Sequence, residues 1–298
     1  AQALRIHEET VRQHLSEWET DEKLKPENGG SWSKLKDNES QMLETHLEEN
    51  IYTRVIEICA YVEKTFHVSY TVSGMTKWLR QHNFSYKKPK EIPAKADAEK
   101  QEIFIEEYLK LVEETPLNEP ILFADSTHPT MATKIVCGWI RKGTDKPIAQ
   151  IASRTRVNVM GAIELSTMNI VSWQPEFVNG ETTTEFFKKV KIAYPHAPKI
   201  HIILDQSGYH RSQQVKEFAK VESIELHYLP PYSPNLNPIE RLWKVMNEQV
   251  RNNRVFKSAK EFRDAIVKFF DVKLPDIAHT LRSRINDNFQ IVNPVPSG

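Results

Sequence analysis

Hydrophobic positions in the first ninety residues recur at the spacing of amphipathic helices. Four such stretches cover residues 3–18, 38–51, 54–66 and 70–84. The last two flank a turn at 67–69, and two short helices around a tight turn are typical of a helix-turn-helix, whose second helix enters a DNA major groove. In the stretch 70–84, apolar residues face inward and polar residues outward: Val72, Met75, Trp78 and Leu79 against Ser73, Thr76, Lys77 and Arg80.

The stretch 3–18 predicts half of a second helix-turn-helix, truncated at Ala1, and 29–34 predicts a flexible break. A small helical bundle that binds another protein is the alternative interpretation. It is favoured by the acidity of residues 1–70, which carry 8 Lys and Arg against 14 Asp and Glu. The basic, proline-broken segment 85–95 favours DNA, because an extended basic chain can follow a phosphate backbone.

From about Pro120 the pattern changes to short β-branched runs bounded by turn residues. These runs predict strands. Hydrophobic residues in two of the intervening segments, 181–194 and 212–221, recur at helical spacing. Antiparallel strands followed by alternating strand and helix predict an α/β fold in which helices cover a mixed sheet. The predicted strands are 121–128, 134–143, 156–166, 169–178, 199–205 and 224–229, and the predicted helices are 181–194, 212–221 and a helix after the proline-rich loop that begins at Leu229.

Composition fits a two-domain globular protein, since the 298 residues are 39% hydrophobic and 27% charged. No apolar run reaches the roughly 18 residues of a membrane span, and no secretory signal is seen. Cys59 and Cys137 lack metal spacing and predict two buried, reduced thiols in a cytoplasmic protein. Because the net charge is zero, DNA binding must rest on local basic stretches, which occur at 77–100 and 241–290.

Two acids end apolar strand runs: Asp125 follows residues 121–124, and Asp205 follows residues 200–204. Each alone is more typical of a turn at a strand end. An ionised carboxylate beside a core strand is costly unless a cation or hydrogen bonds compensate it. Together with Glu240 they make a set of three carboxylates, and such hard oxygen ligands favour Mg²⁺ or Mn²⁺ over zinc.

Glu240 has two competing interpretations. In the first, Asn237 caps the helix, Pro238 is its first residue, and Glu240 reaches back to complete a capping box. In the second, the prolines of the preceding loop stiffen the helix start and hold Glu240 as a positioned metal ligand. The sequence alone leaves both open.

The motifs "FADSTH", "ILDQSGYH" and "PPYSPNLNPIERLWK" resemble those of DDE transposases of the mariner superfamily, in particular the bacterial insertion sequence 630 family. The 34 residues between Asp205 and Glu240 are typical of that group. The segment "FSYKKP" and the helix-turn-helix pattern extend the resemblance over nearly the whole chain. Many relatives have Asn where this chain has Gln206, which is a mild departure because the longer amide can reach the same neighbours.

The resemblance implies an organisation and a mechanism. Residues 1–84 would be a helix-turn-helix DNA-binding region, 85–114 a basic linker and connecting helix, and 115–298 an RNase H-like catalytic domain. Asp125 and Asp205 would lie on adjacent strands, with Glu240 opening a helix across them. The three acids would hold two Mg²⁺ or Mn²⁺ ions, with Asp125 bridging them, for cleavage of transposon ends and transfer of the 3′-hydroxyl to target DNA.

Further residues are weaker candidates. His128 and His210 lie near the acids and are possible auxiliary groups, although ordinary hydrogen-bonding histidines are expected more often. Leu242 and Trp243 are expected to seat the helix in the core, and Trp139 to pack on the sheet. Candidate DNA contacts, each with a solvated surface as the alternative, are Ser73, Thr76, Lys77, Arg80, Lys87, Lys88, Lys90, Arg241, Lys244, Arg251 and Arg254.

The sequence therefore predicts a cytoplasmic, nucleoid-associated bacterial DNA transposase without a membrane segment. Its expected partners are double-stranded terminal repeats, target DNA at a TA step, and a second copy of the chain. Two alternatives stay open: a metal-dependent nuclease or integrase that does not transpose, and a transposase-derived DNA-binding protein without catalysis. The presence of all three acids argues against the second.

Overall fold

The computed structural model describes residues 7–21, 33–89, 93 and 95–293. By its internal contacts the chain divides into two compact units, Ala1–Lys90 and Glu91–Gly298, each considered by itself below. Lys90 lies outside the described residues, as does most of the predicted break at 29–34.

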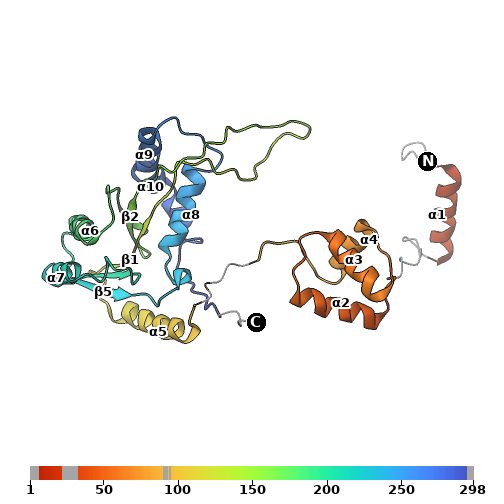
Figure 1. Ribbon diagram of the computed structural model, residues 1–298, viewed down its shortest axis with the longest axis horizontal. Helices are drawn as coiled ribbons and strands as arrows, with labels where there is room; N and C mark the ends of the chain where they lie inside the picture. Colours follow the sequence, from red (N-terminus) through yellow and green to blue (C-terminus); the bar gives the residue numbers. More distant parts are fainter. Residues whose placement is uncertain (1–6, 22–32, 90–92, 94, 294–298) are drawn as a thin grey trace. The chain divides into compact units, whose positions relative to one another are not determined.

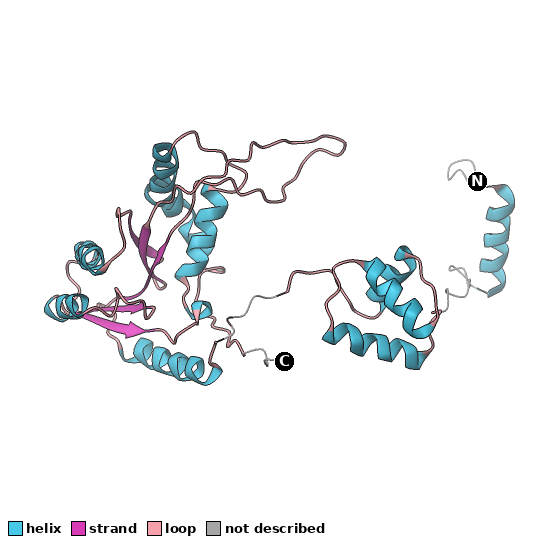
Figure 2. Cartoon of the chain, in the orientation of Figure 1, coloured by secondary structure: helices cyan, strands magenta, loops and turns pink. Residues whose placement is uncertain are grey.

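The first unit is helical in its described residues (Figures 1 and 2). Its core joins Leu43, Val62, Met75 and Trp78. Val72, expected to face inward, is 49% exposed, so the core contacts of its helix begin one turn later, at Met75. The helices are α1 (Glu8–Asp21), α2 (Asp37–Glu49), α3 (Val55–Phe66) and α4 (Val72–Gln81).

The turn between α3 and α4 has a defined start and end. His67 ends α3 in the left-handed conformation, with φ of 58°. Thr71 caps α4, because its side-chain oxygen accepts a hydrogen bond from the backbone N–H of Gly74. These two features produce the predicted pair of short helices around a turn.

The second unit contains a five-stranded sheet of order β3-β2-β1-β4-β5 (magenta in Figure 2). The pairs β3–β2 and β2–β1 are antiparallel, whereas β1–β4 and β4–β5 are parallel. The predicted mixed sheet is therefore present. Its strands are β1 (Ile121–Thr127), β2 (Val159–Glu164), β3 (Asn169–Trp173), β4 (Ile200–Leu204) and β5 (Ile224–Tyr228).

Helices cover both faces of this sheet (Figure 1). Even-numbered residues of β1 and β4, such as Leu122 and Ile202, pack with α6 (Gly180–Ala193) and α7 (Gln213–Val221). Odd-numbered residues, such as Phe123 and Ile203, share the other core with α5, α8 and the C-terminal helices. Those elements are α5 (Ala98–Glu114), α8 (Ile239–Val250), α9 (Ala259–Lys268), the π-helix Phe269–Lys273, α10 (Leu274–Ile277) and the 3₁₀ helix Ala278–Leu281.

One predicted strand is wrong. Residues 134–143 belong to a long non-helical loop between β1 and β2, which leaves the sheet in yellow-green in Figure 1. No strand of the described sheet pairs with this segment, so its β-branched residues have no ladder to join. Trp139, expected to pack on the sheet, is fully exposed, and Cys137, expected to be buried, is also exposed. Cys59 is buried as expected.

Among the described helices, none combines the length and the apolar character required to cross a bilayer.

Candidate active site

Three elements bring the three acids to one edge of the sheet. Asp125 lies in β1, and Asp205 directly follows β4. These strands are parallel neighbours, so their carboxyl ends meet at the same edge. Glu240 is the second residue of α8, which packs against β1 and β2.

Asp125 has an unusual electrostatic environment. Burial raises its pKa to about 7, and the carboxylate of Glu240 and, more weakly, that of Asp205 add to this rise. A hydrogen bond from Trp243 partly offsets it, since a donor stabilises the ionised form. The three acids are therefore electrostatically coupled, and a bound cation would relieve their repulsion.

Trp243 reaches Asp125 because the facing strand carries a glycine. The indole Nε1–H donates to Asp125 Oδ2 at 3.0 Å, and Trp243 is 3% exposed. Gly161 of β2 pairs with Asp125, and a Cβ built on it would lie 2.5 Å from Trp243 Cη2. Only a residue without a side chain lets the ring lie this close to the strand. Trp243 and Leu242 are buried as expected, but sequence reasoning missed the link from Trp243 to Asp125.

Asp205 is held by hydrogen bonds. Its Oδ1 lies 2.7 Å from His210 Nδ1 and accepts the backbone N–H of Ser207, whose hydroxyl donates to Oδ2 at 2.7 Å. Burial opposes ionisation of Asp205, but these bonds outweigh it and lower its pKa to about 2. The second acid is therefore ionised and oriented at neutral pH.

Glu240 does not form the capping box. The backbone N–H of Asn237 donates to the carbonyl of Pro234, and Asn237 Oδ1 is buried without a hydrogen-bond partner. Within the described chain, the Glu240 carboxylate has no hydrogen bond either. The capping interpretation was therefore wrong: the helix start follows a 3₁₀ turn over 234–236, which already occupies the N–H that Glu240 would need.

Burial also raises the pKa of Glu240; Lys244 offsets part of this rise, and the charge of Asp205 adds to it. A half-buried carboxylate with no hydrogen-bond donor from the described chain would be stabilised further by a bound cation.

The donor set fits a hard divalent cation. The carboxylates of Asp125, Asp205 and Glu240 interact electrostatically at one end of the sheet with no thiolate among them, and oxygen-only sets suit Mg²⁺ and Mn²⁺. His210 forms a hydrogen bond with Asp205 Oδ1 and so fixes the orientation of this carboxylate. Residues that hydrogen-bond to metal ligands commonly have this role.

Two further residues connect the strand ends around the acids. Tyr209 OH lies 3.0 Å from Ser126 Oγ, so it joins the end of β1 to the loop that carries Asp205. Gln206 donates to the carbonyl of Leu229 at 3.0 Å, which ties the same loop to the proline-rich segment. Both residues belong to the motif that contains Asp205. Their hydrogen-bond partners could not be predicted from that motif, because they depend on the order of the strands in the sheet.

The two candidate histidines differ in position. His210 is buried at 3% exposure and contacts Asp205 directly. His128 is exposed, and its Nδ1 lies 2.8 Å from Asn158 Oδ1. Asn158 in turn donates to the carbonyl of Glu176, so His128 supports a loop contact.

The basic candidates of the second unit fall into two groups. Arg241 donates to Asn286, and Arg251 donates to Asn247 and Thr130, so both are engaged within the fold. Lys244 and Arg254 are exposed.

In the first unit, α4 presents a polar surface. Ser73, Thr76, Lys77 and Arg80 line one shallow depression together with Gln81. Thr76 uses its hydroxyl to bond the carbonyl of Val72. Lys87 and Lys88 are exposed in the segment that follows the helix.

Two sequence families match the chain. Residues 120–263 match the family described as DDE superfamily endonuclease, and residues 50–108 match the family described as winged helix-turn-helix. The wing of such a domain is formed by β-strands, but the described residues between α4 and α5 (82–89, 93 and 95–97) contain no strand.

Two bacterial proteins are similar over part of the chain. One is the insertion element IS630 uncharacterized 39 kDa protein of Shigella sonnei, 22% identical over 56% of this chain and 49% of that protein. The other is the uncharacterized protein y4pE/y4sA of Sinorhizobium fredii (strain NBRC 101917 / NGR234), 43% identical over 19% of this chain and 39% of that protein. The chain thus spans about half or less of these relatives.

Solved structures of the Mos1 mariner transposase share the fold. The Mos1 strand transfer complex aligns with a TM-score of 0.60 at 16% identity, over 94% of this chain and 85% of that chain. The Mos1 paired end complex with Mg aligns at 0.61 and 15% identity, over 95% and 88%. The sheet is therefore RNase H-like and is preceded by a helix-turn-helix region, as predicted.

Proposed function

We propose that this chain, which belongs to the DDE endonuclease superfamily in the IS630 and mariner group, is a DNA transposase that binds, cleaves and joins transposon ends. The observation that carries the proposal is that Asp125 and Asp205 lie at the ends of parallel neighbouring strands, that Glu240 lies at the start of a helix packed against the sheet, and that their charges are coupled. The order of the strands and the packing of α8 on the sheet explain why the three acids lie near one another. Glu240 is not held there by a capping hydrogen bond.

The three acids would hold two Mg²⁺ or Mn²⁺ ions. Bound there, the metal would activate a water or a DNA 3′-hydroxyl and stabilise the leaving oxygen of the phosphodiester. Asp205 meets this task ionised, because His210 and Ser207 hold its two oxygens. Trp243 donates to Asp125, whose carboxylate is coupled to both other acids and would be the ligand shared by the two ions.

Cleavage and joining would use the same site in turn. Both reactions are in-line displacements at phosphorus, so the residues that orient the attacking oxygen for hydrolysis also serve strand transfer. The exposed Lys244, one turn after Glu240, would contact a phosphate of the bound strand.

Recognition of the terminal repeats is assigned to residues 1–84, with 85–114 as linker and connecting helix and 115–298 as catalytic domain. The exposed side of α4 supports this, because Lys77 and Arg80 share one polar surface. Replacing both with Ala in the full chain should weaken specific binding and reduce its salt dependence by up to about two phosphate contacts. Unchanged binding by titration at several salt concentrations would contradict this assignment.

A homodimer on paired ends and a TA target step are part of the proposal. The loop between β1 and β2 supports association with a second copy, because Ile135, Trp139 and Ile140 are all more than half exposed. Trp139→Ala should therefore lower the dimer fraction on DNA measured by light scattering. A one-to-one complex of wild-type protein with two bound ends would contradict the dimer. Binding to the bacterial chromosome would account for nucleoid association.

Two assays separate the alternatives, and a third identifies the recognised DNA. DNA nicking that requires Mg²⁺ or Mn²⁺ and stops in EDTA distinguishes an enzyme from a DNA-binding protein, and Ca²⁺ should bind without supporting it well. Joining of a cut 3′ end to a second duplex distinguishes a transposase from a nuclease. A selection from random DNA identifies the terminal repeat. Full cleavage in EDTA would refute the metal mechanism.

A further inference from the structure

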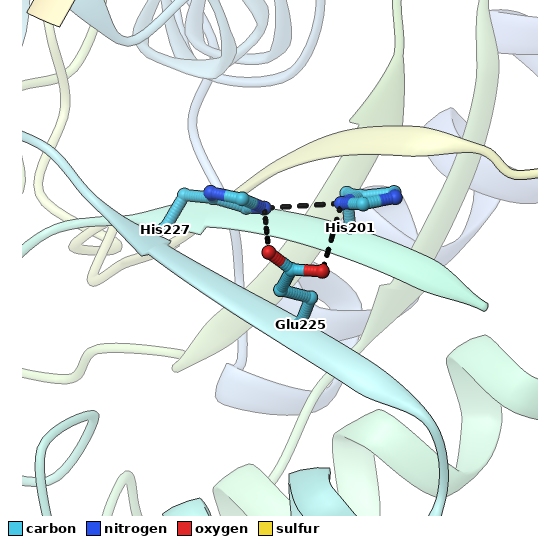
Figure 3. A group of neighbouring side chains, drawn as sticks. All are labelled: His201, Glu225 and His227. Carbon is cyan, nitrogen blue, oxygen red and sulfur yellow. Dashed lines mark hydrogen bonds and ion pairs between the residues drawn. The ribbon is translucent and has the colours of Figure 1, made fainter. Parts of the chain in front are cut away.

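A second group of potential ligands lies on the sheet outside the acid cluster. His201 in β4 and Glu225 and His227 in β5 point toward one another from neighbouring parallel strands (Figure 3). The register pairs His201 with Glu225 and Ile203 with His227, so all three side chains share one sheet face. His201 is 4% exposed, whereas the Glu225 side chain is 47% exposed, so the group is open to solvent on one side.

The distances suit a shared cation. His201 Nδ1 and His227 Nε2 are 3.1 Å apart. Two ligands of a tetrahedral zinc ion at the usual Zn–N distance are separated by about 3.3 to 3.4 Å. The Glu225 oxygens lie 3.8 Å and 3.9 Å from the two ring nitrogens, and this exposed side chain needs to move by less than about 1 Å to complete the set.

An independent contact prepares His201 as a ligand. Its other nitrogen, Nε2, lies 3.3 Å from Glu119 Oε2. This carboxylate favours the tautomer with the proton on Nε2 and leaves the lone pair of Nδ1 directed at His227. Metal-bound histidines usually have such a carboxylate partner on the second nitrogen.

Without a metal, the two ring nitrogens share a hydrogen bond, which His227 Nε2–H donates when His201 has its proton on Nε2. Metal binding exchanges this proton for the cation and releases it to solvent. The ammonium of Lys199, 3.1 Å from Glu225 Oε2, competes with the cation for the carboxylate.

We infer that His201, His227 and Glu225 form a structural site for a borderline divalent transition metal, Zn²⁺ foremost, with water as the fourth ligand. Imidazole with one carboxylate favours Zn²⁺ over Mg²⁺ and Ca²⁺. The ion fastens the sheet-edge strand β5 to β4. The site is separate from the acids, since His201 precedes Asp205 by four residues, about 13 Å along a strand.

The test uses the full chain with Cys137→Ser, which removes an exposed thiol that could bind metal. Excess Mg²⁺ occupies the carboxylate site while Co²⁺ or Zn²⁺ is titrated. One equivalent of Co²⁺ should give the visible absorption of a tetrahedral site, and Zn²⁺ should raise the melting temperature. His227→Gln should weaken Zn²⁺ binding at least tenfold. The matched control, His196→Gln, replaces an exposed histidine outside the group and should bind like the parent.

Glu240→Gln in the same background should retain Zn²⁺ binding, which separates this site from the proposed transposase site. If His227→Gln does not fold in the metal-free state, Glu225→Gln, at a half-exposed position, carries the test. No Zn²⁺-dependent change in the parent, or an unchanged response in the cluster variants, would overturn the inference. Loss of binding in Glu240→Gln would overturn it as well.

Discussion

The two ends of one sheet face carry clusters of different chemistry, and β4 connects them, because His201 lies within this strand and Asp205 directly follows it. At the carboxyl end of β1 and β4, Asp125 and Asp205 meet Glu240, and their charges repel one another. Four residues earlier in β4, His201 meets His227 and Glu225, whose polar atoms already have partners within the fold. The three acids repel one another and would be stabilised by a bound cation, whereas the polar atoms of the histidine cluster already have partners, and a metal would only add stability there.

This difference separates function from stability within one scaffold. Ile203 of β4 and Phe123 of β1 are buried between the two clusters and belong to the core. A substitution at one end should therefore leave the other end intact. The predictions below use this independence.

The largest effect is expected from Glu240→Gln. Because Glu240 makes no capping bond, the amide should preserve α8 but remove an anionic metal ligand. DNA nicking in Mg²⁺ should fall by at least about 100-fold, while the metal-free melting temperature stays unchanged or rises. Asp125→Asn and Asp205→Asn should also abolish cleavage. A folded Glu240→Gln protein that nicks DNA at nearly the wild-type rate would remove Glu240 from the site.

Trp243→Phe should have the next largest effect on the acid end. It removes the N–H donor to Asp125 Oδ2 but keeps an aromatic ring beneath Gly161. Loss of an outer-shell partner typically costs about 10- to 100-fold in metal affinity or activity. The Mg²⁺ concentration for half-maximal nicking should rise accordingly. Trp173→Phe in β3 is the control, and an equal rise there would assign the effect to general packing.

The positions of the three acids at strand ends and a helix start were predictable from local rules, whereas their common location was predicted from the resemblance to DDE transposases. Apolar runs that end in Asp125 and Asp205 indicate strand ends, and a helical pattern begins at Glu240. The partner of Asp125 was not predictable, because Trp243 lies 118 residues away and reaches it only through the pairing of β1 with β2. The predicted strand at 134–143 was wrong because strand propensity does not indicate whether a neighbouring strand is available for pairing.

The histidine cluster is a purely tertiary feature. His201 and His227 are 26 residues apart and show no metal-binding spacing. Their ring nitrogens meet because β4 and β5 are parallel neighbours in one register. A shift of that register by one residue would turn His227 and Glu225 to the opposite face.

Asp125→Asn should stabilise the metal-free protein in a pH-dependent way. The folded-state pKa of Asp125, about 7, lies above its ordinary value of 3.8. The stability associated with its proton is therefore complete below pH 4 and is lost as the pH rises through 7. At pH 8 the variant should exceed wild type by on the order of 1 to 3 kcal/mol in unfolding free energy, and near pH 4 the two should agree. Urea denaturation at both pH values measures this, and a pH-independent difference would contradict it.

The smallest effect is expected at the histidine end, from Lys199→Met. Lys199 holds Glu225 Oε2 at 3.1 Å, and both side chains are nearly half exposed. An exposed ion pair is weak, so removing its cation should tighten Zn²⁺ binding by only about 1.5- to 5-fold. Lys188→Met, which removes a comparable exposed pair with Glu185, should leave the affinity unchanged. Calorimetric titration in excess Mg²⁺ compares the two variants. If Lys199→Met weakens binding or leaves it unchanged, Glu225 is not a ligand, and the two histidines merely share a proton.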